Sequence, residues 1–242
     1  MARERDEAKE HQKDLTRVRK KDANYLAELV ELGIALSASQ GREELNQKIL
    51  MAARNFTNAD GGSLYLVNRE ESELHFRIMV NDTLETFFVS GRESEKPFPP
   101  LQLYDSQGRP NYANIATYVA LTGKAINIDD AYSAEGFDFT GTRAFDAKTG
   151  YRSKSFLTVP LKNTSGVVIG VLQLINARDD AGNVISFDPA IEPIINALAS
   201  QAAVAIENSR LLVAQRDLME SFVRVLGHAI DAKSPHTAGH CS

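Results

Sequence analysis

Two neighbouring apolar segments of strand length constrain the fold of this chain more than any other feature. Residues 155–161 and 167–175 are apolar over most of their length, and the polar turn 162–166 separates them. A strand covered by protein on both faces shows such a continuous apolar pattern, whereas a half-exposed strand alternates. We therefore expect both segments to be central strands of a sheet with a layer on each face.

A long helix is predicted to follow these strands. Asp188 is suited to cap its start and Pro189 to occupy its first position, and after Pro193 in the first turns no helix breaker follows before Gly227. A helix of about 40 residues would extend roughly 60 Å, which exceeds one small core, so we expect it to connect two domains. Its helical seam runs through Ile191, Ile195, Leu198, Ala202, Ala205, Ser209 and Leu212, and an apolar stripe continues through Met219, Phe222, Leu226 and Ile230.

The N-terminal part of the chain also has a helical pattern. Residues 1–24 are densely charged with both signs, and a heptad seam overlaps the end of this segment. The seam predicts a helix that faces either a second chain or its own domain, and we favour a dimeric coiled coil. Its positions are Leu15, Val18, Asp22, Tyr25, Leu29, Leu32 and Leu36.

The middle of the chain alternates between helical, strand-like and irregular segments. The order predicts an α+β domain with one central antiparallel sheet, the terminal helices on one face and two long loops on the other. A pocket between the loops and the sheet is then expected. The predicted elements are helices at 43–55 and 115–122, strands at 63–67, 73–80 and 124–128, a turn at 58–62, and loops at 81–112 and 129–151.

Composition excludes several classes of protein. The net charge of -5 gives no basic field for nucleic acid, and the single cysteine, Cys241, excludes an internal disulfide framework. No apolar run reaches the roughly 18 residues of a membrane span, and the charged N-terminus has no signal-peptide core. We expect a cytoplasmic protein with no nucleic-acid or membrane partner.

An ordered set of motifs resembles the GAF domains of cyclic nucleotide phosphodiesterases, adenylyl cyclases and bacterial signalling proteins. The motifs are AINIDDAY at 125–132, Phe145-Asp146, TGYRSKSFLTVPL at 149–161 and GVVIGVLQLIN at 166–176. The resemblance covers about residues 25–212. It implies a six-stranded antiparallel sheet, a small-molecule pocket and dimerisation through helices.

The cyclic nucleotide-binding members of this family share a discontinuous signature, which this sequence matches in part. Asn176, Phe187 and Glu192 agree with it, but Ala177 replaces the signature lysine and Ile191 replaces the aspartate. The lysine–aspartate ion pair cannot form, which argues against a cyclic nucleotide as the ligand.

The pocket candidates combine polar and aromatic side chains, which suit a purine-like or heteroaromatic ligand. Alternatively, the two aspartates are turn formers, the aromatic rings are local packing and the serine is structural. The candidates are Ser63 at a strand start, and Tyr132, Phe137, Asp138, Thr142 and Asp146 in the loop over the pocket.

The C-terminal residues resemble the beginning of an HD-GYP domain, a metal-dependent phosphodiesterase of cyclic dinucleotides. Thr237, Gly239, His240 and Ser242 match its first metal-ligand segment, whereas Asp231 and Ser234 depart from the usual residues. His236 and His240 are four residues apart and could share one divalent ion, Fe or Mn in this family. The remaining ligands would lie beyond residue 242, so we expect no metal, cofactor or catalysis in this chain itself.

We divide the chain into a charged N-terminal helix or linker at 1–24, a GAF sensory domain at 25–212, and a linker helix with the start of an HD-GYP domain at 213–242. The leading hypothesis is a small-molecule-binding and dimerising regulatory module of a bacterial-type signalling protein, whose full-length form we expect to be a metal-dependent phosphodiesterase of cyclic dinucleotides. The alternative is a constitutive dimerisation and signal-relay scaffold with a vestigial pocket. A third hypothesis, that the chain itself is a hydrolase, lacks the necessary ligands.

Overall fold

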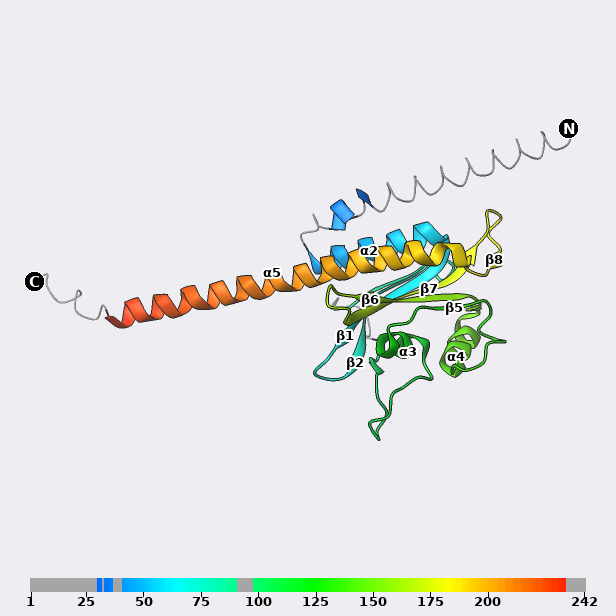
Figure 1. Ribbon diagram of the computed structural model, residues 1–242, viewed down its shortest axis with the longest axis horizontal. Coiled ribbons are helices and arrows are strands. Elements are labelled where there is room, and N and C mark those ends of the chain that lie inside the picture. The colour runs from blue at the N-terminus through cyan, green and yellow to red at the C-terminus, as the bar shows by residue number, and fades with distance from the viewer. Residues whose placement is uncertain (1–29, 32, 37–40, 91–97, 234–242) are drawn as a thin grey trace, which may run out of the picture.

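The computed structural model describes residues 30–31, 33–36, 41–90 and 98–233, which form an α+β domain and a projecting helix (Figure 1). The helices are α2 (Arg42–Thr57), α3 (Ile115–Thr122), α4 (Thr140–Thr149), the 3₁₀ turn η1 (Pro189–Ile191) and α5 (Glu192–Lys233). The strands are β1 (Ala59–Asn68), β2 (Glu73–Asn81), β3 (Thr86–Val89), β4 (Leu101–Gln102), β5 (Ile126–Ile128), β6 (Phe156–Lys162), β7 (Val168–Arg178) and β8 (Val184–Ile185).

One antiparallel sheet contains every one of these strands. Its main path has the order β3-β2-β1-β7-β6-β5, while β4 pairs with β2 and β8 pairs with β7. The predicted six-stranded sheet therefore corresponds to the main path, and the two additional strands are only two residues long. As the apolar segments predicted, β6 and β7 are central and mostly buried.

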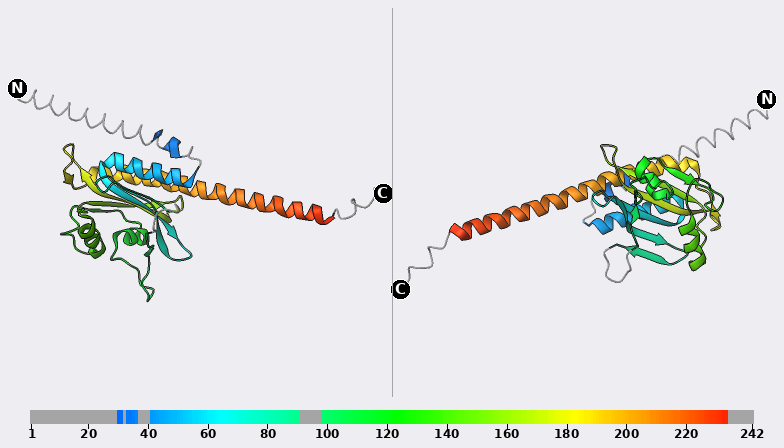
Figure 2. Two further views of the ribbon diagram at one scale, coloured as in Figure 1. Left: turned by 180° about the vertical axis from the view of Figure 1, so that it is seen from behind. Right: turned by 90° about the horizontal axis from the view of Figure 1, so that it is seen from below.

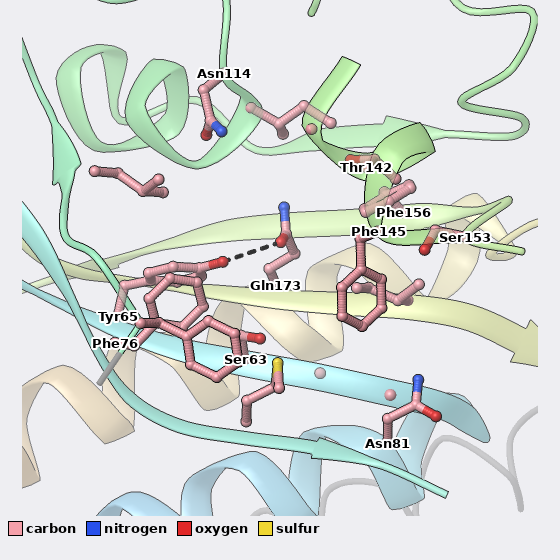
Figure 3. A pocket seen from close by; sticks show the side chains of 18 of the residues that line it. Ser63, Tyr65, Phe76, Asn81, Asn114, Thr142, Phe145, Ser153, Phe156 and Gln173 are labelled. Atoms are coloured by element: carbon pink, nitrogen blue, oxygen red, sulfur yellow. Dashed lines mark hydrogen bonds between the residues drawn. The ribbon is translucent and has the colours of Figure 1, made fainter. Parts of the chain in front are cut away.

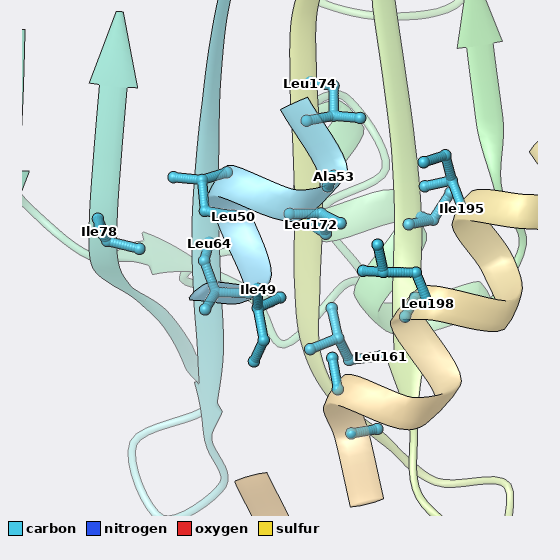
Figure 4. Close-up of a cluster of buried hydrophobic side chains, with 14 of the residues drawn as sticks. Ile49, Leu50, Ala53, Leu64, Ile78, Leu161, Leu172, Leu174, Ile195 and Leu198 are labelled. Carbon is cyan, nitrogen blue, oxygen red and sulfur yellow. The ribbon is translucent and has the colours of Figure 1, made fainter. Parts of the chain in front are cut away.

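The helices α2 and α5 cover one face of the sheet (Figure 1). Leu50 of α2 and Leu198 of α5 pack with Leu172 of β7 in the main core, and all three are 0% exposed (Figure 4). Close packing of α2 requires a glycine below it, because a Cβ atom on Gly62 would lie 2.9 Å from Cδ1 of Leu50. The apolar face predicted for the helix at 43–55 is therefore the face of α2 that packs against the sheet.

The opposite face of the sheet carries α3, α4 and the long connecting segments (Figure 1). A second apolar cluster lies here, in which Val119 of α3 packs with Leu74, Phe156 and Val171 of the sheet. The prediction of helices on one face and connecting segments on the other is confirmed in outline. It missed that residues 140–149 of the second loop form a helix.

The long helix α5 leaves the domain near residue 211 and projects away from it (Figure 2). Its first half is buried in the main core, whereas its second half exposes a row of large apolar side chains. By length and composition alone, the helical segment Pro189–His228 could cross a membrane, since an 18-residue window of it has a mean hydropathy of 1.2, but 33% of this window is buried within the domain. The exposed side chains are Leu211, Leu212, Leu218, Met219, Phe222, Val223, Val225 and Leu226.

Several element boundaries differ from the sequence prediction. The strand β1 begins at Ala59, so Gly61 and Gly62 are paired strand residues and not part of a turn. The turn is Asn58, which has φ 49° and ends α2. Asp188 does cap the start of the C-terminal helical segment, since its Oδ1 accepts a hydrogen bond from the amide of Ala190 at 2.9 Å.

Two predictions fall mainly outside the described residues. Of the heptad seam at 15–36, only Leu36 is described, and it is 3% exposed within the core of its own domain. His236 and His240 lie outside the described part, so the predicted coiled coil and metal ligands stay predictions.

Candidate functional site

A cavity of about 460 Å³ lies between the sheet and the layer that contains α3 and α4 (Figure 3). Its floor comes from β1, β2 and β7, and its roof from the segments around Asn114 and 138–145. This volume is in the range of sites for small organic ligands. The lining includes the polar residues Ser63, Asn81, Asn111, Asn114, Asp138, Thr142, Tyr151, Ser153 and Gln173, and the aromatic residues Tyr65, Phe76, Phe98, Phe139, Phe145 and Phe156.

The floor of the cavity has its polar groups on two paired strands. Ser63 of β1 is opposite Gln173 of β7, and Oη of Tyr65 donates to Oε1 of Gln173 at 3.4 Å (Figure 3). Burial raises the pKa of Tyr65, so its hydroxyl stays protonated. The amide nitrogen of Gln173 also donates to Oγ1 of Thr158 at 3.3 Å. Hydroxyl and amide groups are thus held on a rigid surface.

One side wall of the cavity joins a buried charged network. Tyr151 lines the cavity, and its hydroxyl donates to the carboxylate of Asp60, which is 2% exposed. Burial, and then the hydrogen bond to Asp60, raise the pKa of Tyr151. Asp60 also pairs with Arg178 at 2.9 Å, which gives the buried carboxylate a cationic partner.

The roof is formed by the beginnings of two helices. Asn114 caps α3, because its side chain accepts hydrogen bonds from the amides of Ala116 and Thr117. Asp138 accepts from the amide of Thr140 at 2.8 Å, at the start of α4. Hydrogen bonds from Thr140 hold the pKa of Asp138 below its usual value, so this carboxylate is charged at neutral pH.

The cavity has little charge of its own. Among the described residues that line it, Asp138 is the only one charged at neutral pH, and no lysine, arginine or histidine is present. The wall can donate and accept hydrogen bonds through amides and hydroxyls and can stack on aromatic rings. Such a surface suits a neutral or weakly charged heteroaromatic molecule.

The structure places three of the six predicted pocket residues in the cavity wall. These are Ser63, Asp138 and Thr142. The other three, Tyr132, Phe137 and Asp146, lie outside it. Phe137 packs edge-on against Tyr118 with ring centroids 5.4 Å apart, as in the packing alternative.

Asp146 connects α4 to the segment before β6. It is 3% exposed, and its carboxylate accepts from the amide and the hydroxyl of Ser153, each at 2.8 Å. The hydroxyl of Tyr132 donates to the same carboxylate at 2.7 Å. Arg152 lies over the Tyr132 ring, 4.0 Å from its centroid. These groups support the cavity from behind, because Ser153 is part of its wall.

Sequence reasoning missed most of the residues on the strands and in the first long loop. Gln173 offered a signal, because it is a polar residue within the apolar segment 167–175. Asn114 also offered a signal, because it directly precedes the predicted helix at 115–122 and asparagine is a preferred N-cap residue. Asn81, Ser153 and Phe145 gave no such signal, since their positions depend on the pairing of distant segments.

Two of the three residues that match the cyclic nucleotide signature, Asn176 and Phe187, have structural roles. Asn176 has φ 57° and is 1% exposed, and its side chain bonds to the backbone of Arg152, Lys154 and Ser155. Phe187 is 1% exposed in the main core. Neither residue is in the cavity wall.

A small group of metal-type ligands lies elsewhere, on the β1–β2 hairpin. Ligand atoms of Glu71, Glu73 and His75 lie within 4.8 Å of one another, and Glu71 is exposed. The described residues of the 460 Å³ cavity contain none of these three, so the group is not part of the candidate site.

Fold and cavity together define the class of the chain: an α+β domain that encloses a small-molecule-sized cavity between a sheet and short helices. A sequence model of the family described as GAF domain matches residues 41–206. The chain therefore belongs to the GAF domain family.

Relatives in sequence include cyclic nucleotide phosphodiesterases. The chain is 32% identical over 170 residues to dual 3′,5′-cyclic-AMP and -GMP phosphodiesterase 11 of Drosophila melanogaster, covering 69% of the chain and 11% of the relative. It is 29% identical over 196 residues to dual 3′,5′-cyclic-AMP and -GMP phosphodiesterase 11A of Takifugu rubripes, covering 81% and 20%. The chain is thus a GAF regulatory domain as in these phosphodiesterases, and it spans a fifth or less of their length.

Solved structures agree on the fold. The GAF domain of an Acinetobacter phosphoenolpyruvate-protein phosphotransferase matches with a TM-score of 0.56 and 16% identity, covering 78% of this chain and 97% of that one. Free methionine-R-sulfoxide reductase from Neisseria meningitidis, in complex with its substrate, matches with a TM-score of 0.54 and 15% identity, covering 79% and 93%.

Proposed function

We propose that this GAF domain binds a small heteroaromatic molecule and transmits its presence through α5 to a neighbouring domain. The observation that carries the proposal is the 460 Å³ cavity, whose wall alternates aromatic rings with amides and hydroxyls. Ser63, Asp138, Thr142 and Gln173 are the proposed polar contacts.

A purine-type ligand fits this wall best. The ring would stack on aromatic side chains, while the Gln173 amide and the Asp138 carboxylate would form hydrogen bonds with the polar atoms at the edge of the ring. The names of the relatives support a cyclic nucleotide. The substitutions Ala177 and Ile191 and the absence of a cation among the described lining residues favour a purine ligand without a phosphate.

The relay would depend on a homodimer formed through the terminal helices. The second half of α5 exposes apolar side chains such as Leu218, 73% exposed, and Phe222, 60% exposed. A ligand can shift the geometry of such a dimer only if it binds two helix arrangements with different affinity.

The setting of the domain is proposed from the C-terminal sequence. The residues around His236 and His240 resemble the start of an HD-GYP domain. The full-length protein would then be a cytoplasmic bacterial-type phosphodiesterase of cyclic dinucleotides, with a divalent metal such as Fe or Mn in that domain. The GAF domain itself would be regulatory and inactive.

The second candidate is a constitutive dimerisation scaffold with a vestigial pocket. The departures at Ala177 and Ile191 favour it. It predicts the same helices and the same dimer but no ligand.

A thermal-shift screen separates the two candidates. Cyclic mono- and dinucleotides, purine nucleosides and free purines are tested on the wild type, on Gln173→Leu and on Gln102→Leu as a control outside the cavity. A ligand at about 100 times its dissociation constant stabilises by about 2.7 kcal/mol. We expect a shift in the wild type and in Gln102→Leu that Gln173→Leu loses. No shift with any compound, or an equal shift in Gln173→Leu, would favour the scaffold.

A further inference from the structure

A second, smaller cavity lies on the helical face of the sheet, away from the cavity described above. It measures about 190 Å³, and it is bounded by the start of α2, by β2 and by α5. Three arginines line it, namely Arg42, Arg77 and Arg210, together with the polar side chains of Asn46, Ser90 and Ser209. The space holds far more than one water molecule but is below the roughly 300 Å³ of typical sites for drug-sized ligands.

A β-bulge directs one of the three arginines to this site. Leu64 of β1 pairs with Ile78 and Tyr65 pairs with Phe76, so Arg77 is an extra residue between them. A bulge bends the strand and re-aims a side chain, and bulges are frequent beside functional sites. Successive side chains of a regular strand point to opposite faces of the sheet, and the bulge interrupts this alternation in β2 at Arg77.

In the described part of the chain the charge of Glu207 acts favourably on Arg210, but none of the three guanidinium groups lies in close contact with a carboxylate. No ion pair there involves Arg42, Arg77 or Arg210. Glu43 lines the cavity but is exposed and forms none of these pairs, and Oε1 of Glu207 accepts from Asn163. The Nε atom of Arg77 is buried without any hydrogen-bond partner.

Burial and the repulsion of like charges both act on Arg77 and Arg210, whereas Arg42 is exposed at the rim of the cavity. Burial, and then the charge of Arg42, lower the pKa of Arg77. Burial, and then the charges of Arg77 and Arg42, lower the pKa of Arg210, and the charge of Glu207 opposes this shift only in part. Gathering like charges around a half-buried space is unfavourable unless an anion offsets it.

The start of α2 adds a further donor group. Its N-cap residue is Gly41, whose position supplies no side-chain hydrogen bond to the first turn. The first amides of a helix carry partial positive charge and bind anions well. Guanidinium forks likewise match the oxygens of phosphate.

We propose that the cavity among Arg42, Arg77 and Arg210 binds a small oxyanion, namely phosphate or the phosphate group of an ester. The bound anion joins α2, β2 and α5. Arg210 directly precedes Leu211, where α5 becomes exposed. Occupancy therefore secures the base of the projecting helix, independently of any ligand in the larger cavity.

The test measures phosphate binding by the full chain with calorimetry and thermal shift, with chloride at equal ionic strength as the salt control. The variants are Arg77→Met, Arg77→Lys and Arg210→Met, and Arg216→Met is the matched control on the exposed part of α5. Loss of one charged hydrogen-bond donor should weaken phosphate binding by about tenfold or more in Arg77→Met and Arg210→Met. Arg77→Lys should fall between Arg77→Met and the wild type, because lysine keeps the charge but loses the fork.

Arg216→Met and the cavity variant Gln173→Leu should bind phosphate like the wild type. Adenosine monophosphate in place of inorganic phosphate identifies the source: tighter binding that still depends on Arg77 assigns the site to a phosphate ester. Arg210→Met keeps the test valid should Arg77→Met fail to fold. The proposal is overturned if the wild type gains nothing from phosphate over chloride, or if both methionine variants bind phosphate as the wild type does.

Discussion

At the scale of single residues, Asp60 shows how a buried charge can organise the domain. Its carboxylate accepts from the Tyr151 hydroxyl and from Thr83, at both the hydroxyl and the amide, and it pairs with Arg178. A buried charge is tolerated only when it has partners and hydrogen bonds. Because Tyr151 is also in the cavity wall, this network connects the site to the end of β7.

Removing this charge should therefore destabilise the domain. We expect Asp60→Asn to lower the free energy of unfolding by about 2 kcal/mol, because Tyr151 and Thr83 lose a charged hydrogen-bond acceptor and Arg178 keeps only its more exposed partner Asp82. Urea denaturation measures the change. Asp105→Asn is the control, because the Asp105–Arg109 pair is exposed and should leave the stability nearly unchanged. Equal effects of the two substitutions would contradict the role given to Asp60.

Asp138, in the roof of the 460 Å³ cavity, gives a prediction for the pH dependence of stability. Hydrogen bonds from Thr140, first from its side chain and then from its amide, lower its pKa. For a carboxylate with a lowered folded-state pKa, the stabilising contribution is present above the unfolded value of about 3.9 and is lost as pH falls through the folded value.

An NMR titration of the Asp138 carboxyl group checks this expectation. Its midpoint should lie below about 3.9 in the wild type and rise in Thr140→Ala. A wild-type midpoint at or above the ordinary value would show that the start of α4 does not hold this carboxylate.

At the scale of elements, α5 has two halves with different environments. Leu198 is 0% exposed against β6 and β7, while Leu218, further along the same helix, is 73% exposed. Only the first half gains stability from the domain core. The second half is a helix whose apolar side chains have no described partner within the chain, which is why a dimer is proposed for it.

Matched substitutions separate the two halves. Leu198→Ala should destabilise the domain by about 2–5 kcal/mol, because it opens a cavity in a close-packed core. Leu218→Ala should leave the stability of the domain unchanged and weaken self-association instead. Thermal unfolding and light scattering measure the two properties, and a strictly monomeric wild type at high concentration would remove the proposed dimer.

The elements also show how far the sequence could predict the structure. Continuous apolar segments identified β6 and β7, and Asp188-Pro189 identified the start of the 3₁₀ turn η1 that leads into α5. The helix α4 was missed because Thr140, Gly141 and Thr142 are weak helix formers, although Gly150 does end it in a left-handed conformation.

The site was harder to predict than the fold. Its floor combines Ser63 and Gln173, which meet only through the pairing of β1 and β7. Asp146 belongs to the motif that resembles GAF domains, but its buried side chain lies outside the cavity and holds the wall residue Ser153 in place. Three-dimensional pairing, which no local pattern contains, decided which polar residues face the cavity.

At the scale of the whole molecule, the sheet separates two surfaces with different proposed roles. The helices α3 and α4 lie on one face, and α2 and α5 lie on the other (Figure 1). The 460 Å³ cavity is on the side of α3 and α4, and the arginine-lined cavity is on the side of α2 and α5. A signal from the cavity to α5 would pass through the strands β1 and β7, which form the centre of the sheet. Central strands that contact both layers are suited to such a relay.

The most direct test of the central claim is an amide NMR titration of the full chain with purine nucleosides and their cyclic monophosphates. At least one compound should shift the signals of Gly61, Gly62 and the Gln173 side-chain amide, and Gly182, in the β7–β8 turn, should stay unchanged. If no compound moves the cavity signals, or if shifts are confined to the exposed half of α5, the domain does not bind a purine-type ligand in this cavity.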